Sequence, residues 1–284
     1  MKKSPEEVMK AKLFPGDNSP KLSDIKQDPA LQDCWFLSSI TALLTSQGTQ
    51  SIQRLFTPSQ NEGFVNIRLG YNNYEVPMGR ICSADGKSKF GSNSAPWVVA
   101  LENAMMIHLS LGRESDGIRN NTADMNLKEP LDGLKALVGS NHYDNAHFIR
   151  HSSSGINAFN AIKDSIDSGM PVVLGHAGNA LSSLGDGIAP NHAITVLDCH
   201  KNEAHPDKSF VTVLDPYGEV KNLYVKDLSK CMIYTASDSF KQAAQQGETI
   251  QDTFDLGRGP DGTSKEVEIT DTMQAELDKK NDDF

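Results

Sequence analysis

The sequence predicts an α+β protein in which a helical lobe is followed by a lobe built on an antiparallel β-sheet. Two apolar segments of helical length, 34–46 and 96–111, dominate the first half of the chain. After about residue 170 the apolar residues come instead in short runs separated by Gly, Pro and Asn, which is typical of antiparallel strands. We predict an N-terminal extension (1–25), a helical lobe (26–145), a β-rich lobe (146–236) and a C-terminal extension (237–284).

The first half contains four predicted elements. A short helical pattern runs from Pro5 to Leu13 and ends at a Pro/Gly/Asn break. The apolar segment 34–46 is the next helix. Residues 63–80 alternate between apolar and polar, which predicts a hairpin that turns around Asn72 and Asn73. Residues 96–111, rich in Met and Leu, complete this half as a helix.

The second half begins with an amphipathic helix and continues with strands. Apolar residues at helical spacing predict a helix over 155–168 that ends at Gly169. Residues 237–284 are polar and contain little that could drive burial, and no internal repeat is found. The predicted strands of this half are 170–176, 192–199, 209–215, 220–225 and 231–235.

Charge and hydropathy exclude several classes of function. The 284-residue chain has a formal net charge of −10, which argues against nucleic acid or an anionic membrane as the main partner. No apolar stretch is long enough to span a bilayer, and the N-terminus lacks the apolar core of a signal peptide. We therefore expect a soluble protein that is cytoplasmic or leaves its cell by a route without a signal peptide.

The four cysteines show no spacing typical of disulfide or zinc frameworks. Cys199 and Cys231 stand in apolar strand-like segments, where burial is expected, whereas Cys82 stands in a polar loop. Cys34 differs from all three because it follows two polar residues at the start of an apolar helix. A helix start favours an anion and therefore the thiolate. A cysteine in an apolar helix more often packs as a small hydrophobe. The interpretation of Cys34 as a nucleophile therefore needs partner residues that could activate the thiol.

Two later residues supply those partners. His192 begins an apolar strand, and Asp215 follows 23 residues later in a turn. A nucleophilic thiol needs a base, and that base needs a polar group to orient it. His176, at the end of a β-like run, is an alternative base. Asp198 is a rival to Asp215, but it lies about 20 Å from His192 along the same predicted strand.

Four segments resemble motifs of the calpain family of cysteine proteases, in the same order. Gln27 to Leu37 resembles the nucleophile segment, in which a Gln precedes Gly-Asp-Cys-Trp, and Trp97 to Ala104 resembles the Trp-x-x-Leu-Leu-Glu-Lys-Ala helix. His192-Ala193 resembles the Gly-His-Ala strand, and Asp215-Pro216-Tyr217-Gly218 resembles the Asn-Pro-Trp-Gly turn. The resemblance covers about residues 20–236, and it is remote between the motifs.

The resemblance implies a papain-like fold of two lobes with the active site in the cleft between them. It implies an endopeptidase with Cys34 as nucleophile, His192 as base and Asp215 in place of the family's Asn. The family's oxyanion-hole glutamine corresponds to Gln27, which stands one residue too far upstream, or to Gln32, which replaces a Gly. Calpains require calcium, but no Asp-rich loop here has the spacing of a helix–loop–helix calcium site, so we predict no metal and no other cofactor.

Two other functions fit the same residues. The triad could act on a glutamine side chain, as a deamidase or transglutaminase, because the acyl-enzyme would only be intercepted differently. A binding module that kept the fold without turnover is the other alternative. The loop from Gly178 to Pro190 could gate the cleft or be a plain surface loop.

The small protease-like core suggests a bacterial effector that acts on host proteins, with a role in virulence. We expect a protein substrate, a monomer, and a secretion chaperone as one partner that the N-terminal extension could bind.

Overall fold

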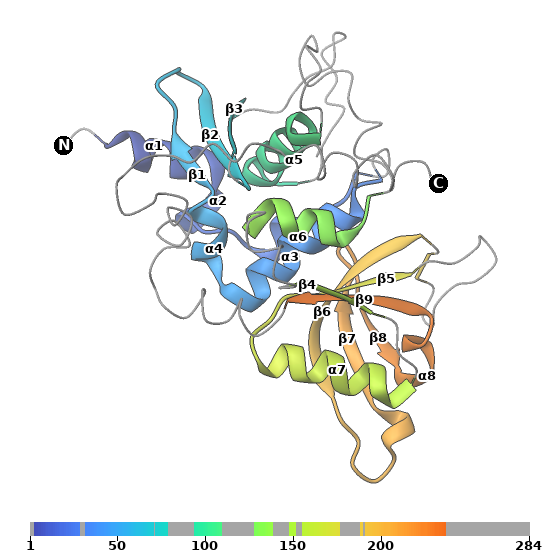
Figure 1. Cartoon of the computed structure of the whole chain (residues 1–284). Coiled ribbons are helices and arrows are strands. Elements are labelled where there is room, and N and C mark those ends of the chain that lie inside the picture. The colour runs from blue at the N-terminus through green and yellow to red at the C-terminus, as the bar shows by residue number, and fades with distance from the viewer. Residues whose placement is uncertain are drawn as a thin grey trace, which may run out of the picture. The chain divides into compact units, whose positions relative to one another are not determined.

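The chain folds as an α+β protein with two antiparallel sheets, which confirms the predicted class (Figure 1). The computed structural model describes residues 3–28, 32–70, 72–78, 94–109, 128–138, 148–151, 155–176, 188–189 and 191–236. All of them belong to one compact unit, residues 1–242. The predicted C-terminal extension, Cys82 and most of the loop 178–190 lie outside the described residues.

Helices of the first half surround a central one, α3 (Cys34–Gln47), which is buried from Cys34 to Leu44. Gly48, with φ 76°, ends it. The helix α1 begins with a capping box, in which Ser4 Oγ accepts from the Glu7 N–H and Glu7 accepts from the Ser4 N–H. The helical elements of this half are α1 (Pro5–Leu13), α2 (Pro15–Asn18), η1 (Leu22–Asp24), α3, α4 (Thr49–Gln53), α5 (Pro96–Leu109) and α6 (Pro130–Val138).

A three-stranded antiparallel sheet also belongs to this half. It consists of β1 (Phe56–Pro58), β2 (Phe64–Leu69) and β3 (Asn72–Pro77) in that order. The hairpin is confirmed, but the prediction that it turns at Asn72 and Asn73 is wrong. Asn72 already pairs with Leu69, and the chain reverses after Gly70, whose φ of 59° suits glycine. The strand β1 and the helix α6 were not predicted.

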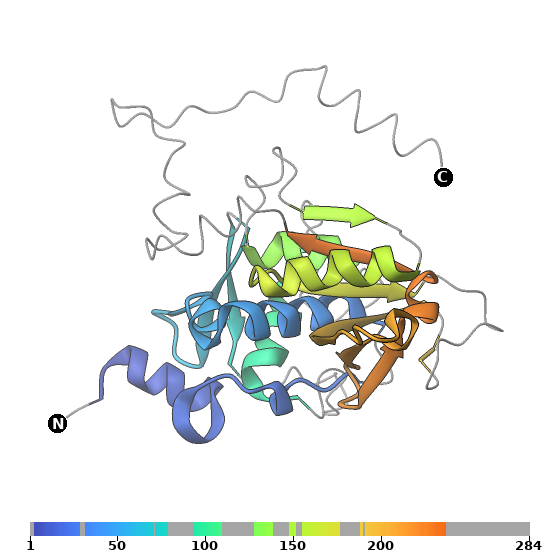
Figure 2. The same cartoon turned by 90° about the horizontal axis from the view of Figure 1, so that it is seen from below.

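The second half is a six-stranded antiparallel sheet with the strand order β4-β9-β5-β6-β7-β8. All five predicted strands are confirmed to within two residues at each end, and β4 is an addition. Figure 2 shows β4 at the edge of the sheet beside β9. The strands are β4 (Phe148–His151), β5 (Val172–His176), β6 (His192–His200), β7 (Phe210–Leu214), β8 (Val220–Tyr224) and β9 (Cys231–Ala236).

Helices cover both faces of this sheet, because its central strands are apolar on both sides. Leu174 and Ile194 face α7 (Gly155–Asp167) and share one core with its Phe159. Thr195 and Val173, which alternate with them, form a register pair on the other face, where α3 lies. The short elements η6 (Pro206–Lys208) and α8 (Val225–Leu228) complete this half. The helix that begins with Cys34 is therefore packed directly against the strand that begins with His192 (Figure 1).

None of the helices in the described parts of the chain is long and apolar enough to cross a membrane.

Candidate active site

Cys34 is the first residue of α3, with Asp33 at the N-cap position. Its side chain is largely buried, with an exposed fraction of 8%. The first backbone N–H groups of a helix have no partner within the helix, and they carry the positive end of its dipole. Cys34 therefore stands at the positive end of the α3 dipole.

His192 connects Cys34 to Asp215. Its Nε2–H donates to Asp215 Oδ1 over 3.1 Å, and both side chains are buried. His192 also forms a hydrogen bond with the Cys34 thiol. Because Nε2 is taken by Asp215, Nδ1 is the ring nitrogen left to bond with the sulfur. The structure thus brings together the three residues that the sequence singled out.

The electrostatics of these residues favour a charged imidazole. Burial alone would lower the pKa of His192, but the hydrogen bonds to Asp215 and Cys34 and their negative charges raise it to about 9. Burial would likewise raise the pKa of the Asp215 carboxyl. The hydrogen bonds from His192 and from the Tyr217 N–H outweigh burial and hold that pKa below its usual range. At neutral pH His192 is an imidazolium between a carboxylate and the sulfur.

A tight turn holds Asp215 in place. Its Oδ1 also accepts from the Tyr217 N–H over 2.9 Å, and its carbonyl accepts from the Gly218 N–H over 2.7 Å. Gly218 has φ 95°, a conformation that side chains rarely adopt. The turn closes where the Asp215 N–H donates to the Glu219 carbonyl over 2.8 Å. The carboxylate is therefore oriented from two sides before it meets the imidazole.

Tyr217 is a site residue to which the sequence analysis gave no role. Its ring stacks on the imidazole of His192, with centroids 5.6 Å apart and planes 16° from parallel. Tyr217 remains 49% exposed, whereas His192 is only 8% exposed, so the tyrosine covers the His192–Asp215 hydrogen bond. The signal that could have found it is its place in the Asp-Pro-Tyr-Gly turn, where the calpain motif also has an aromatic residue.

Of the two glutamines considered for the oxyanion, Gln27 is buried and Gln32 is exposed. The Gln27 N–H donates to the carbonyl of Pro216 over 2.8 Å. This bond places the segment before α3 against the turn that holds Asp215. Of the two, Gln27 is therefore the one that lies buried beside this turn.

His176 and Asp198, the alternatives to His192 and Asp215, are engaged elsewhere. His176 lies opposite His192 in the β5–β6 pairing, is 3% exposed, and donates from Nδ1 to the Ala189 carbonyl over 3.1 Å. Asp198 is exposed and lies 3.6 Å from His200, so it does not orient His192. His142 and His147, and the side chain of His151, lie outside the described residues.

The remaining described cysteines are unlike Cys34. Cys231 is buried and Cys199 partly buried, and both are free thiols. Burial raises the pKa of each thiol to about 12. Both are neutral at pH 7, so they serve as internal controls for thiol reactivity.

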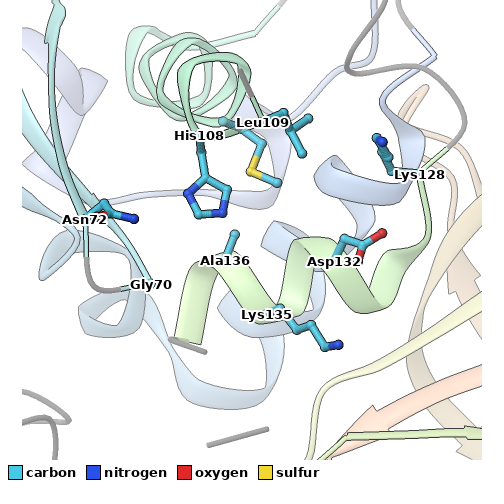
Figure 3. Close-up of a pocket in the computed structure, with 9 residues that line it drawn as sticks. Gly70, Asn72, His108, Leu109, Lys128, Asp132, Lys135 and Ala136 are labelled. Atoms are coloured by element: carbon cyan, nitrogen blue, oxygen red, sulfur yellow. The ribbon is translucent and has the colours of Figure 1, made fainter. Parts of the chain in front are cut away.

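A hollow whose lining includes no residue of the triad lies between α5, α6 and the connection from β2 to β3 (Figure 3). Its volume is about 310 Å³. His108 Nδ1 and Tyr74 Oη are 2.9 Å apart beside it, and burial lowers the pKa of His108. It is lined by Gly70, Asn72, Met105, His108, Leu109, Lys128, Asp132, Lys135 and Ala136.

Within the described ranges, no group of three or more His, Cys, Asp or Glu side chains is arranged to hold a metal ion.

Comparison of the chain with protein-family models and with curated proteins finds no match.

Proposed function

We propose that the protein is a calpain-like cysteine endopeptidase that hydrolyses protein substrates through Cys34, His192 and Asp215. The observation that carries the proposal is the position of His192, which hydrogen bonds to Asp215 at 3.1 Å and to the Cys34 thiol at a helix start. Thiolate and imidazolium together are the reactive state of such a site. A helical half followed by an antiparallel sheet, with the thiol on one and the imidazole on the other, supports a papain-like plan.

The chemistry follows from this arrangement. The Cys34 thiolate attacks the peptide carbonyl carbon, a C–S bond forms, and the carbonyl electron pair moves to oxygen. The His192 imidazolium gives its proton to the leaving amine as the C–N bond breaks, which leaves a thioester. Neutral His192 then takes a proton from water, whose oxygen attacks the thioester. The acid product leaves, and thiolate and imidazolium are restored.

Two groups are available for the negative oxygen of the tetrahedral intermediate. One is the backbone N–H of Cys34, at the start of α3. The other is the side-chain amide of Gln27, which is buried beside the Asp215 turn. Loss of one such donor costs on the order of 10²–10³ in kcat. Gln27→Ala should therefore lower kcat more than the exposed control Gln32→Ala.

The proposal is tested first by thiol trapping, which needs no known substrate. The native protein is treated with an epoxide at pH 6 to 7, and intact mass and peptide mapping locate the label. We expect one fast label at Cys34, lost in Cys34→Ala and slowed about 10²-fold or more in His192→Ala. Cys199→Ser is the matched control and should label like the native protein. Slow labelling spread over several cysteines would overturn the proposal and favour a binding module.

A digest of candidate protein substrates then separates the possible reactions. New fragments that disappear with Cys34→Ala support the endopeptidase. A mass gain of about one unit without fragments, or a new cross-link, would instead indicate a glutamine deamidase or transglutaminase, because ammonia rather than a peptide amine would leave as the acyl-enzyme forms.

A further inference from the structure

Two carboxyl groups are buried together immediately behind the nucleophile. Asp33 precedes Cys34, and Glu102 comes from the middle of α5. Both residues have an exposed fraction of 0%, and the two carboxyls lie close enough to share a hydrogen bond if one of them keeps its proton. Acidic side chains are almost never fully buried unless they are paired.

A hydrogen bond between the Asp33 and Glu102 carboxyls requires that one of the two keeps its proton. Apart from the Asp33 backbone N–H beside its own carboxyl, no donor group in the described part of the chain reaches the four carboxyl oxygens. An ionised carboxylate only accepts hydrogen bonds, so two carboxylates can bond to each other only when one of them keeps its proton. Two buried carboxyls in contact hold one proton between them for the same reason as other acidic dyads.

Asp33 gives up its ordinary role to make this contact. An aspartate at an N-cap position usually accepts from a backbone N–H of the first helical turn. Asp33 occupies the N-cap of α3, yet its side chain makes no such bond. Instead its backbone carbonyl accepts from Phe36 and Leu37, while its side chain turns inward to α5. The start of the nucleophile helix is thereby tied to a second helix.

The charges around the pair all favour keeping the proton. Burial is the main cause that raises the pKa of both carboxyls, and the negative charge of Asp28 adds to it. Asp33 in turn raises the pKa of Tyr217, so the pair is within electrostatic range of the ring that covers His192. Among the described residues, Asp28 and Tyr217 are thus the titratable groups outside the pair that interact with its charge.

We propose that Asp33 and Glu102 share one proton and act as positioning residues, a carboxyl latch that fixes the start of α3, and with it the Cys34 sulfur, to α5. The catalytic part of this inference rests on the proposed function. The latch holds while one proton is present, because a singly protonated pair carries one charge and one internal hydrogen bond. When that proton is lost, two negative charges face each other in a dry interior.

Amide substitutions imitate the closed latch. In Glu102→Gln or Asp33→Asn, the amide N–H donates to the remaining carboxylate, so charge and hydrogen bond match the singly protonated pair at every pH. Glu102→Leu has a similar volume but cannot form the bond. It leaves the Asp33 carboxylate buried without a partner, which is destabilising.

The first readout is the pH dependence of urea unfolding between pH 5 and 9. A raised folded-state pKa gives stability that is present below the unfolded value and is lost as pH rises towards the folded one. The unfolding constant of the native protein should rise by up to about tenfold per pH unit through the shared proton. Glu102→Gln should remove this part of the slope, while the contribution of His192 stays the same in both proteins. Equal slopes in the native protein and Glu102→Gln would overturn the shared proton.

The second readout is the rate at which iodoacetamide labels Cys34, under conditions in which every variant is folded. Glu102→Gln and Asp33→Asn should label within about twofold of the native rate, and Glu102→Leu about tenfold or more slowly. If folded Glu102→Leu labels at the native rate, the positioning role is overturned. If Glu102→Leu does not fold, the positioning role is overturned when Asp33→Asn labels more slowly than the native protein. Neither readout needs proteolysis, so absence of peptide cleavage with both results intact would defeat the proposed function and leave the latch standing.

Discussion

At the residue scale, a single oxygen organises the base. Asp215 Oδ1 accepts from both His192 Nε2 and the Tyr217 N–H. The same atom therefore orients the imidazole and holds the turn that carries Tyr217, whose ring stacks on that imidazole. This double use explains why the carboxyl stays ionised despite its burial. It also means that the charge of His192 depends on one neighbouring residue.

Asp215→Asn should shift the pH dependence of activity. His192, with its pKa of about 9, is stabilised as imidazolium, and the leaving amine needs its proton, so kcat/KM should fall above that pH. An asparagine still accepts from Nε2 but carries no charge, so the alkaline limb should move down by about 1–3 pH units. Alkylation of Cys34 should not show this fall, because a thiolate needs no proton to react.

The pH–rate profile of peptide hydrolysis, with NMR titration of His192, checks this expectation. Asp198→Asn removes an exposed carboxylate from the same sheet and is the control. An alkaline limb that stays in place in Asp215→Asn would show that Asp215 does not set the charge of the base.

Tyr217 provides a second test at this scale. Tyr217→Phe keeps the ring on His192, whereas Tyr217→Ala exposes the His192–Asp215 bond to water. Stacked rings are worth about 0.5–1.5 kcal/mol, so the alanine variant should lose roughly two- to tenfold in kcat/KM while the phenylalanine variant keeps it. Steady-state kinetics on one peptide distinguishes the two, and equal losses would assign the effect to the hydroxyl instead.

At the scale of elements, close packing of α6 fixes α3 from a different side than the sheet does. A Cβ on Gly133 of α6 would lie 2.6 Å from Ser39 Oγ and 3.3 Å from the Trp35 ring. Ser39 Oγ donates to the Pro130 carbonyl over 2.9 Å, which ties the two helices together at the same place. The glycine is therefore a packing requirement.

Gly133→Ala should destabilise the protein by about 1–3 kcal/mol, because the added methyl overpacks this contact. The sign of the change in stability distinguishes the two cases, since the same substitution inside an unobstructed helix stabilises the protein by about 0.5–1 kcal/mol. Urea unfolding measures it. An increase in stability would mean that α6 does not approach α3 this closely.

The elements that could be predicted are those with a strong period or an unbroken apolar run. The helix from Cys34 and the strands from His192 and Phe210 have such patterns. The short strand β1 has too few residues to show a period. The hairpin turn was misplaced because two asparagines are a stronger turn signal in sequence than the lone Gly70 that makes it.

The site divides in the same way. The grouping of Cys34, His192 and Asp215 could be predicted because their residue types and order are those of a chemical mechanism. The stacking of Tyr217 and the pairing of Asp33 with Glu102 could not, because they are contacts between side chains that no local pattern records. The choice between Gln27 and Gln32 likewise needed burial.

At the scale of the whole molecule, two reciprocal hydrogen bonds join the helical half to the sheet. Ser38 Oγ donates to the Ala193 carbonyl over 2.9 Å, and Thr195 Oγ1 donates to the Ser38 carbonyl over 2.8 Å. Both side chains have an exposed fraction of 0%. Ser38 is one turn after Cys34, and Ala193 follows His192, so these bonds set the separation of thiol and imidazole.

Thr195→Val should weaken this connection with little change in volume. It leaves the buried Ser38 carbonyl without its side-chain donor, which costs about 1–3 kcal/mol of stability. Alkylation of Cys34 should slow, because the thiol and the imidazole are no longer held at the same separation. Replacing His192 by alanine should then reduce the alkylation rate less in Thr195→Val than in the native protein. Thr212→Val, whose hydroxyl contacts His200 and Asn222 on the sheet, is the control. Unchanged alkylation in a destabilised Thr195→Val would show that the two bonds serve folding alone.

The strand order has a consequence for the timing of synthesis. The strand β9 is the last described element, yet it lies inside the sheet, between β4 and β5. The strand β5 in turn supports β6, which begins with His192. A ribosome must therefore release the chain through residue 236 before this sheet can close. Cys34 is made early and His192 is fixed late, so under the proposed function a growing chain would pass through most of its translation without an assembled triad, chemically harmless to itself and to its neighbours.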